Sequence, residues 1–178
     1  MSDLPIRSAR LVLDRLVAAD AEDFRRIVTI SEVGRMLFIF PTDYTTEAAA
    51  ALIARDADPA CRPLRLAIRR PGGDCLLGTI GLGVGDKPDI YYFLDPAAAG
   101  QGLMREAVAL FLPFVQARFG LLALGAKVFT DNPASARVLE ANGFHRVGHD
   151  EVQSAQRDEL HPVWLYRAEY ADPHAPLE

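Results

Sequence analysis

Two glycines mark a place where the chain could hold an anion. The segment FLDPAAAGQGLMREA (residues 93–107) is typical of the end of a strand, a short loop with Gly100 and Gly102, and the start of a helix. Such a turn points unpaired backbone N–H groups and the positive end of a helix at an anion, and glycine lets a phosphate approach the main chain. The segment therefore predicts a phosphate site, with a plain glycine turn at a helix start as the alternative.

Two common phosphate-binding loops do not fit this spacing. A dinucleotide-binding fingerprint needs a small residue three places after Gly102, where this chain has Arg105. A Walker A loop needs Gly-Lys followed by Ser or Thr, and the segment does not contain these residues. The spacing therefore excludes both of these classes of nucleotide site.

A second segment, DNPASARVLEANGF (residues 131–144), contains clear signals for both ends of a short helix. Asn132 is a favoured N-cap residue and Pro133 suits the first helical position. Gly143 follows the last turn, where the left-handed conformation is least strained for glycine. The segment therefore predicts one short helix.

Together the two segments resemble the GNAT acetyltransferases, in which a Gly-x-Gly pyrophosphate loop is followed, in the same order and spacing, by Asn-Pro-x-Ser/Ala and a short helix that ends on Gly-Phe. The opening SARLVLDRL (residues 8–16) is similar to the first strand of the subgroup related to ribosomal-protein alanine N-acetyltransferases. LGTIGL (residues 77–82) and Glu106-Ala107 also fit that subgroup. The resemblance covers nearly the whole chain.

The resemblance implies acetyl-CoA as the cosubstrate. The residues that it assigns to the pantetheine arm are Phe93 and Leu94. Those that it places around the phosphates are Gly100, Gln101, Gly102, Leu103 and Met104. It also implies that Asn132 touches the cosubstrate, although a helix N-cap is an equally good role for this side chain.

Two positions, Ala97 and Leu139, differ from the usual family pattern, and Ser135 lies near the second of them. Ala97 stands where the family usually has Gln or Arg at the head of the pyrophosphate loop, which removes one side-chain contact but leaves the backbone amides. Leu139 stands where many members have a Tyr that acts as the general acid. The ribosomal-protein subgroup often has a Ser where Ser135 stands, one helical turn before Leu139 and on the same face.

Acetyl transfer needs a neutral amine, a donor near the developing oxyanion and a proton source for sulfur. We expect Ser135 to donate that proton and Asp89, where the family often has Glu, to act as base through water. The alternatives are an ordinary serine in a first helical turn and a turn residue after Pro88. Tyr91 and Tyr92 either line an acceptor groove or pack as aromatic residues of a strand.

The expected function is an N-acetyltransferase that moves an acetyl group from acetyl-CoA to a primary amine by direct attack in a ternary complex. The acceptor is a protein N-terminus or a small amine, and the sequence leaves this choice open. The alternative is a noncatalytic acyl-CoA-binding module that has lost the general acid at Leu139. Homodimers are frequent in the resembling family, so a homodimer is a further possibility.

The fold class that these segments require is α/β (α+β). We expect one GNAT-like domain over residues 1–178, with a mixed, mostly antiparallel central sheet of about six to seven strands flanked by helices on both faces. The expected strands are residues 9–16, 64–70, 76–84, 90–94, 121–129, 146–152 and 163–169. The expected helices begin near residues 18, 46, 102 and 132, and residues 31–40 are helix or loop. Pro113 should kink or break the third of these helices.

Composition excludes several other classes. The net charge of −5 and the lack of a Lys/Arg block argue against a nucleic-acid partner. The opening residues lack the apolar core of a signal peptide and no run is long enough for a membrane span, so we expect a cytoplasmic protein without a membrane partner. Cys61 and Cys75 form no Cys-x-x-Cys unit, and no metal site is expected.

Overall fold

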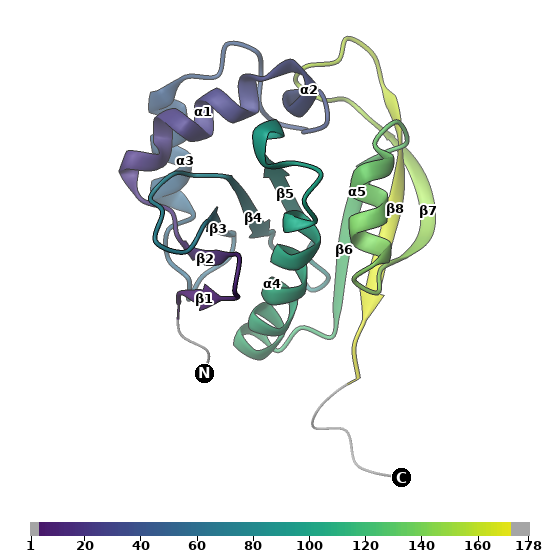
Figure 1. The fold of residues 1–178 in the computed structure, drawn as a ribbon. Coiled ribbons are helices and arrows are strands. Elements are labelled where there is room, and N and C mark those ends of the chain that lie inside the picture. Colours follow the sequence, from purple (N-terminus) through teal and green to yellow (C-terminus); the bar gives the residue numbers. More distant parts are fainter. Residues whose placement is uncertain (1–3, 172–178) are drawn as a thin grey trace.

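The strands form two antiparallel sheets whose edges meet at one point (Figure 1). The computed structural model describes residues 4–171. The first sheet has the order β1 (Ile6–Arg7), β2 (Val12–Arg15), β3 (Leu64–Arg69), β4 (Gly78–Leu82) and β5 (Ile90–Leu94). The second has the order β6 (Ala123–Phe129), β8 (His161–Glu169) and β7 (His145–Val152). The expected mixed, mostly antiparallel architecture is confirmed, with eight strands in two sheets instead of six to seven in one.

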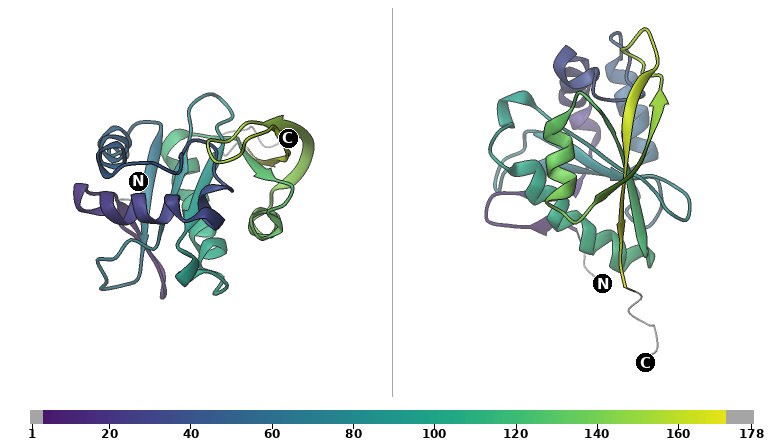
Figure 2. Two further views of the ribbon diagram at one scale, coloured as in Figure 1. Left: turned by 90° about the horizontal axis from the view of Figure 1, so that it is seen from above. Right: turned by 90° about the vertical axis from the view of Figure 1, so that its right-hand side faces the viewer.

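The two sheets meet where β5 begins. Asp89 and Gly125 form an isolated parallel bridge, and the amide of Gly125 donates to the carbonyl of Pro88 at 3.0 Å. Beyond this bridge β5 and β6 separate, and Figure 2 shows the second sheet turning away from the first. The neighbouring edges of β5 and β6 therefore diverge from the bridge, and we call this divergence the splay.

Helices cover both faces of the first sheet. On one side lie the 3-10 turn η1 (Ala18–Asp20) and the helices α1 (Ala21–Thr29), α2 (Ser31–Gly34) and α3 (Thr46–Arg55). On the other side lies α4 (Leu103–Phe119), which follows the 3-10 turn η2 (Pro96–Ala98). The last helix, α5 (Pro133–Glu140), packs on the second sheet.

Alternation along the strands divides the core into two layers. In β3, Leu66 and Ile68 are buried in the cluster that includes α4, whereas Ala67 is buried in the cluster that includes α1 and α3. Successive strand residues point to opposite faces, so an uninterrupted apolar run is expected of a sheet covered on both sides. This explains why β3 and β4 are almost entirely buried.

The helix expected to kink or break at Pro113 does not break there, and the kink stays a prediction. Helix α4 continues through Pro113 from Leu103 to Phe119. Both Pro113 and Ala109, whose carbonyl loses its partner, are exposed, so water can satisfy that carbonyl. The buried residues on either side, among them Phe111 and Phe114, pack into the core and stabilise the helix across the proline.

The uncertain segment 31–40 is helical only at its start, where α2 covers Ser31–Gly34. Within residues 4–171, no helix is both long and apolar enough to cross a membrane.

Candidate functional site

The splay between β5 and β6 contains a cavity of about 900 Å³. Its walls come from six parts of the chain, between the α2 region and the end of β7. These are the α2 region, strands β5 and β6, the loop from residue 99 to 105, helix α5, and the end of β7. The fold therefore brings both segments identified from the sequence to one cavity.

The glycine loop presents its main chain to this cavity. Gly100 and Gly102 have φ angles of 74° and 72°, in the left-handed region that favours glycine. Gly102 is the N-cap of α4, and the first amides of any helix lack partners within the helix. Leu103 and Met104 line the cavity but are buried in the core, so they offer mainly their N–H groups. These amides and the positive helix end are groups that suit an anion, and the phosphate site expected from the sequence stays a prediction.

The side chain of Gln101 points away from this role. Its Oε1 accepts a hydrogen bond from Arg70 Nη2 at 2.6 Å, and its carbonyl accepts one from Arg10 Nη1 at 3.0 Å. Arg10 also forms an ion pair with Glu106 in the first turn of α4. Gln101 therefore holds the loop in place through these two bonds, and the group that it can offer to an anion is its backbone N–H.

The outer edge of β5 is open to the cavity at alternate residues. The carbonyl of Asp89 and the amide of Asp95 both bond to residues that flank β4, at 2.9 Å and 2.7 Å. Because hydrogen-bonding groups alternate in direction along an antiparallel strand, the N–H and C=O groups of Tyr92 and Leu94 point toward β6. Leu94 therefore lies where a ligand could pair with the strand.

Phe93 is placed differently from Leu94. Its backbone faces β4, and its buried ring packs edge-on against Phe24 of α1, with centroids 5.0 Å apart. The side chain thus packs in the core beneath α1, although Phe93 also lines the cavity. The period-two alternation of a strand could have separated Phe93 from Leu94 in the sequence.

The Ser135 hydroxyl contacts the Tyr92 hydroxyl in the cavity. Asn132 Oδ1 accepts from the Ser135 amide at 3.1 Å, so Asn132 is the N-cap of α5 as well as part of the cavity wall. The hydroxyls of Ser135 and Tyr92 are 2.9 Å apart, and Tyr92 also donates to the Ser135 carbonyl at 3.3 Å. Burial raises the pKa of the Tyr92 phenol, although its hydrogen bond with Ser135 acts in the opposite direction. Leu139, one turn later, is fully buried.

The neighbouring Tyr91 also lines the cavity, but its hydroxyl and ring make packing contacts away from Ser135. Its hydroxyl donates to the carbonyls of Leu64 and Leu82, at 3.3 Å and 3.2 Å. The buried guanidinium of Arg65 lies 4.4 Å from the centre of its ring. Gly81 leaves the space that the ring occupies, because a Cβ there would overlap it. The two tyrosines thus have separate roles.

Asp89 lies at the junction of the two sheets, in the cavity wall. Its carboxylate occupies the space beside Gly125, where a Cβ would overlap Oδ1. Burial raises the pKa of Asp89, and the positive charges of Lys127 and Arg167 partly oppose that effect. A half-buried carboxyl with a raised pKa is a stronger base than an ordinary aspartate, which suits a candidate general base.

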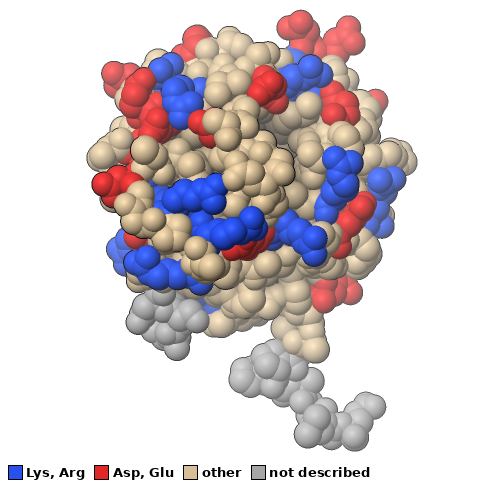
Figure 3. Space-filling model, viewed as in Figure 1, with Lys and Arg blue, Asp and Glu red and all other residues tan. Residues whose placement is uncertain are grey.

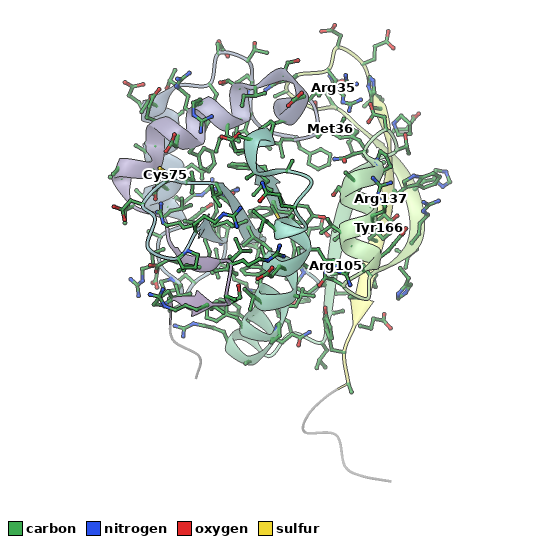
Figure 4. All side chains as sticks on the ribbon, viewed as in Figure 1. Arg35, Met36, Cys75, Arg105, Arg137 and Tyr166 are labelled. Carbon is green, nitrogen blue, oxygen red and sulfur yellow. The ribbon has the colours of Figure 1, made fainter. Side chains whose placement is uncertain are left out.

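Two arginines stand on the wall near the glycine loop. Arg105 of α4 and Arg137 of α5 both line the cavity and are exposed (Figure 4). Neither has an ion-pair partner within residues 4–171. Figure 3 shows Lys and Arg side chains gathered on this face of the molecule. Arg105 and Arg137 thus add positive charge to the cavity wall beside the helix ends.

A loop crosses from the second sheet to the α2 region, and we call residues 153–157 the cross-loop. The amide of Ala155 donates to the carbonyl of Phe38 at 2.9 Å. Gln156 Nε2 donates to the carbonyls of Val28 and Phe40, at 3.1 Å and 2.8 Å. Arg157 Nε donates to the carbonyl of Arg35 at 2.8 Å. These bonds join the two halves of the molecule a second time, away from the Asp89 junction.

The splayed strands, the glycine loop and α5 correspond to a known domain. Residues 10–145 match the model of the acetyltransferase (GNAT) domain. The chain belongs to the GNAT acetyltransferase family.

Similarity to curated members of the GNAT family is moderate. The probable N-acetyltransferase YjcK of Bacillus subtilis is 40% identical over 80 residues, which cover 42% of this chain and 44% of YjcK. The match therefore spans less than half of that relative. The uncharacterized N-acetyltransferase YoaA of the same organism is 29% identical, with coverage of 80% and 84%.

Solved GNAT structures share the fold at low identity. Spermidine N-acetyltransferase from Vibrio cholerae, in complex with CoA and spermine, has a TM-score of 0.79 at 16% identity and covers 93% of this chain and 98% of its own. The ribosomal-protein-S5-alanine acetyltransferase from Vibrio fischeri has a TM-score of 0.78 at 17% identity, with coverage of 98% and 100%. The similarity to ribosomal-protein acetyltransferases inferred from the sequence is therefore confirmed at the level of fold.

Several residues of this GNAT site were not found from the sequence. Arg10 and Arg70 support the glycine loop through Gln101, and Arg157 bonds to the carbonyl of Arg35 beside the α2 region; isolated arginines carry no local signal of such contacts. Within residues 4–171, no group of three or more His, Cys, Asp or Glu side chains could hold a metal ion. Both cysteines are exposed free thiols.

Proposed function

We propose that this GNAT protein transfers an acetyl group from acetyl-CoA to a primary amine by direct attack in a ternary complex. One observation carries the proposal: the glycine loop, the open edge of β5 and the Tyr92–Ser135 hydroxyl pair all face the same cavity. The glycine loop offers amides to the phosphates, and the edge of β5 offers a strand edge to the amide-containing pantetheine arm. The Tyr92–Ser135 pair offers a proton donor for the sulfur.

Acetyl-CoA has groups that match these features in turn. The amides of Gly100 to Met104 suit the pyrophosphate, and Arg105 and Arg137 add positive charge beside it. The free N–H and C=O groups of Leu94 suit the amides of pantetheine. Asn132 stands in the wall but its Oδ1 caps α5, so its amide nitrogen is the group that is free for the cosubstrate.

The chemistry needs no covalent enzyme intermediate. The amine nitrogen attacks the thioester carbon, the C–N bond forms, and the C–S bond breaks with its electrons passing to sulfur. Ser135 supplies a proton to the sulfur, and Asp89 accepts the proton lost by nitrogen through a water molecule. The raised pKa of Asp89 suits this role.

The acceptor would bind on the side of α2. That part of the wall is largely apolar, with Val33, Met36 and Phe38, and it carries one exposed carboxylate, Glu32. In Figure 4, Met36 lies near the upper end of the view and Arg105 lies lower, on α4. A carboxylate beside an apolar wall fits a cationic amine attached to an apolar body, which includes small amines and peptides that begin with an apolar residue.

The first test is calorimetric titration of acetyl-CoA into the purified protein. We expect micromolar or tighter binding, and absence of binding at millimolar concentration would contradict the proposal. The second test measures CoA release with a panel of apolar monoamines, polyamines and peptides. Binding without turnover of any acceptor would instead support a noncatalytic acyl-CoA-binding module.

The acceptor side is tested with a matched pair of variants. We expect Glu32→Gln to raise KM for amines about tenfold, because it removes the negative charge that faces the amine. Glu151→Gln removes an exposed carboxylate just before the wall residue Val152 and should leave KM unchanged. Equal effects of the two substitutions would contradict the acceptor site.

A further inference from the structure

One hydrogen bond links the two walls of the cavity. The hydroxyl of Tyr92 on β5 lies 2.9 Å from Oγ of Ser135 in the first turn of α5. The Tyr92 side chain shares its face of β5 with Ile90 and Leu94, opposite the face of Tyr91 and Phe93. The bond therefore lies inside the splay, beside the strand edge assigned to the cosubstrate.

We propose that Tyr92 is a positioning residue for acetyl transfer, which holds the Ser135 hydroxyl so that its proton points at the leaving sulfur. This inference rests on the proposed function and adds to it a residue that acts through Ser135. In this arrangement the Tyr92 and Ser135 hydroxyls, on opposite walls of the cavity, together replace the tyrosine that usually acts as the general acid.

The proton count of the two hydroxyls allows this arrangement. Each hydroxyl has one proton and two lone pairs, and either one can donate in the Tyr92–Ser135 bond. When Tyr92 directs its proton to Ser135 Oγ and not to the Ser135 carbonyl, it occupies one lone pair and leaves the serine proton free for another acceptor. Without the phenol, a serine within the first helical turn can rotate and bond to nearby backbone groups instead. Tyr92 thus selects the useful rotamer of Ser135.

Position 139, where many family members have the general acid, offers no proton donor beside Ser135. Leu139, one helical turn later, is fully buried in the core with Phe144. Burial of Tyr92 raises the pKa of its phenol, so the group remains a neutral hydroxyl at working pH. During transfer sulfur gains one proton from Ser135 as nitrogen loses one to Asp89, and water must then take the proton from Asp89 and return one to Ser135, so that the whole cycle has no net change in protons.

The test compares Tyr92→Phe, Ser135→Ala and the double variant, with the acceptor that the wild-type protein turns over best. We expect Tyr92→Phe to lower kcat about tenfold and Ser135→Ala about a hundredfold, with the Kd for acetyl-CoA within about twofold of wild type. The double variant should equal Ser135→Ala alone, because Tyr92 acts only through Ser135.

The control is Tyr91→Phe, which removes an identical oxygen from the next residue of β5. Its hydroxyl bonds only to two backbone carbonyls, so we expect a lower Tm and a kcat within about twofold of wild type. An unchanged kcat in Tyr92→Phe would overturn the positioning role, and so would a double variant slower than Ser135→Ala. If Tyr92→Phe does not fold, Ser135→Ala removes the same bond from the other wall, and its unchanged kcat would also overturn the role. Lack of wild-type turnover would instead count against the proposed function.

Discussion

Arg157 donates to both carboxylate oxygens of Asp131, at 3.1 Å and 2.9 Å. Asp131 directly precedes the N-cap of α5, and Arg157 is the last residue of the cross-loop. The arginine side chain is only 5% exposed and lies 4.0 Å from the centre of the Phe129 ring. This pair therefore connects the helix that carries Ser135 with the loop that closes over the α2 region.

Removal of this arginine should loosen that connection. We expect Arg157→Leu to lower the free energy of unfolding by about 1–2 kcal/mol, a moderate value because Asp131 is 43% exposed and can be solvated. Urea denaturation measures the change. Arg25→Leu, which breaks the exposed pair of Arg25 with Glu22 on α1, should cost far less. Similar losses in both variants would show that the cross-loop pair is merely a surface contact.

The same pair predicts a dependence of stability on pH. Hydrogen bonds from Arg157 lower the pKa of Asp131 below its ordinary value of 3.8. A carboxyl with a lowered folded pKa stabilises the protein above its unfolded pKa and loses that effect as pH falls toward the folded one. The stability difference between wild type and Asp131→Asn, measured by urea denaturation, should therefore be constant near neutral pH and shrink below about pH 4. A difference that grows on acidification would contradict the lowered pKa.

Two glycines with the same backbone angle separate strain from cosubstrate binding. Gly102 has φ 72° and Gly72, in the turn after β3, has φ 73°. An added Cβ meets no atom within 4 Å at Gly72 and only the tip of Arg10 at Gly102. Each change to Ala should cost about 1–2 kcal/mol of stability, because both positions are left-handed. Only Gly102→Ala should also weaken acetyl-CoA binding, by about tenfold in calorimetry. Equal affinities would place the phosphates elsewhere.

The charge beside Asp89 should set the acid limb of the activity profile. Lys127 opposes the increase that burial causes in the pKa of Asp89. Removal of that positive charge destabilises the carboxylate, so the pKa rises further and activity is lost at a higher pH. We expect Lys127→Met to move the acid limb of kcat/KM upward by roughly half a pH unit. Lys87→Met, in the turn before β5, is the matched control and should not move it. An unmoved limb in Lys127→Met would argue against Asp89 as the base.

Local signals predicted the parts of the fold that depend on neighbouring residues. Asn132, Pro133 and Gly143 define the ends of α5 because capping acts within a few residues. Gly100 and Gly102 are recognisable for the same reason, since a left-handed turn requires glycine wherever the rest of the chain lies. Pro113 misled because its effect depends on which side of the helix faces water.

Contacts between distant segments could not be predicted in this way. The two sheets are joined by a bridge between Asp89 and Gly125, and neither residue has a pattern that reveals its partner. Tyr92 and Ser135 are 43 positions apart, so their contact follows only once the strand edge and the helix are placed. The candidate residues were therefore identifiable by type, while their division of roles was a property of the fold.

The crowding at the sheet junction also constrains how such a chain can evolve. The Asp89 carboxylate fills the space that any side chain at position 125 would need. A mutation of Gly125 would displace the carboxylate from the junction, and a small residue at 89 would release position 125 to vary. Among descendants of this chain, substitutions at positions 89 and 125 should therefore occur together. Gly125 takes no part in chemistry, but it would be kept as strictly as Asp89 beside it.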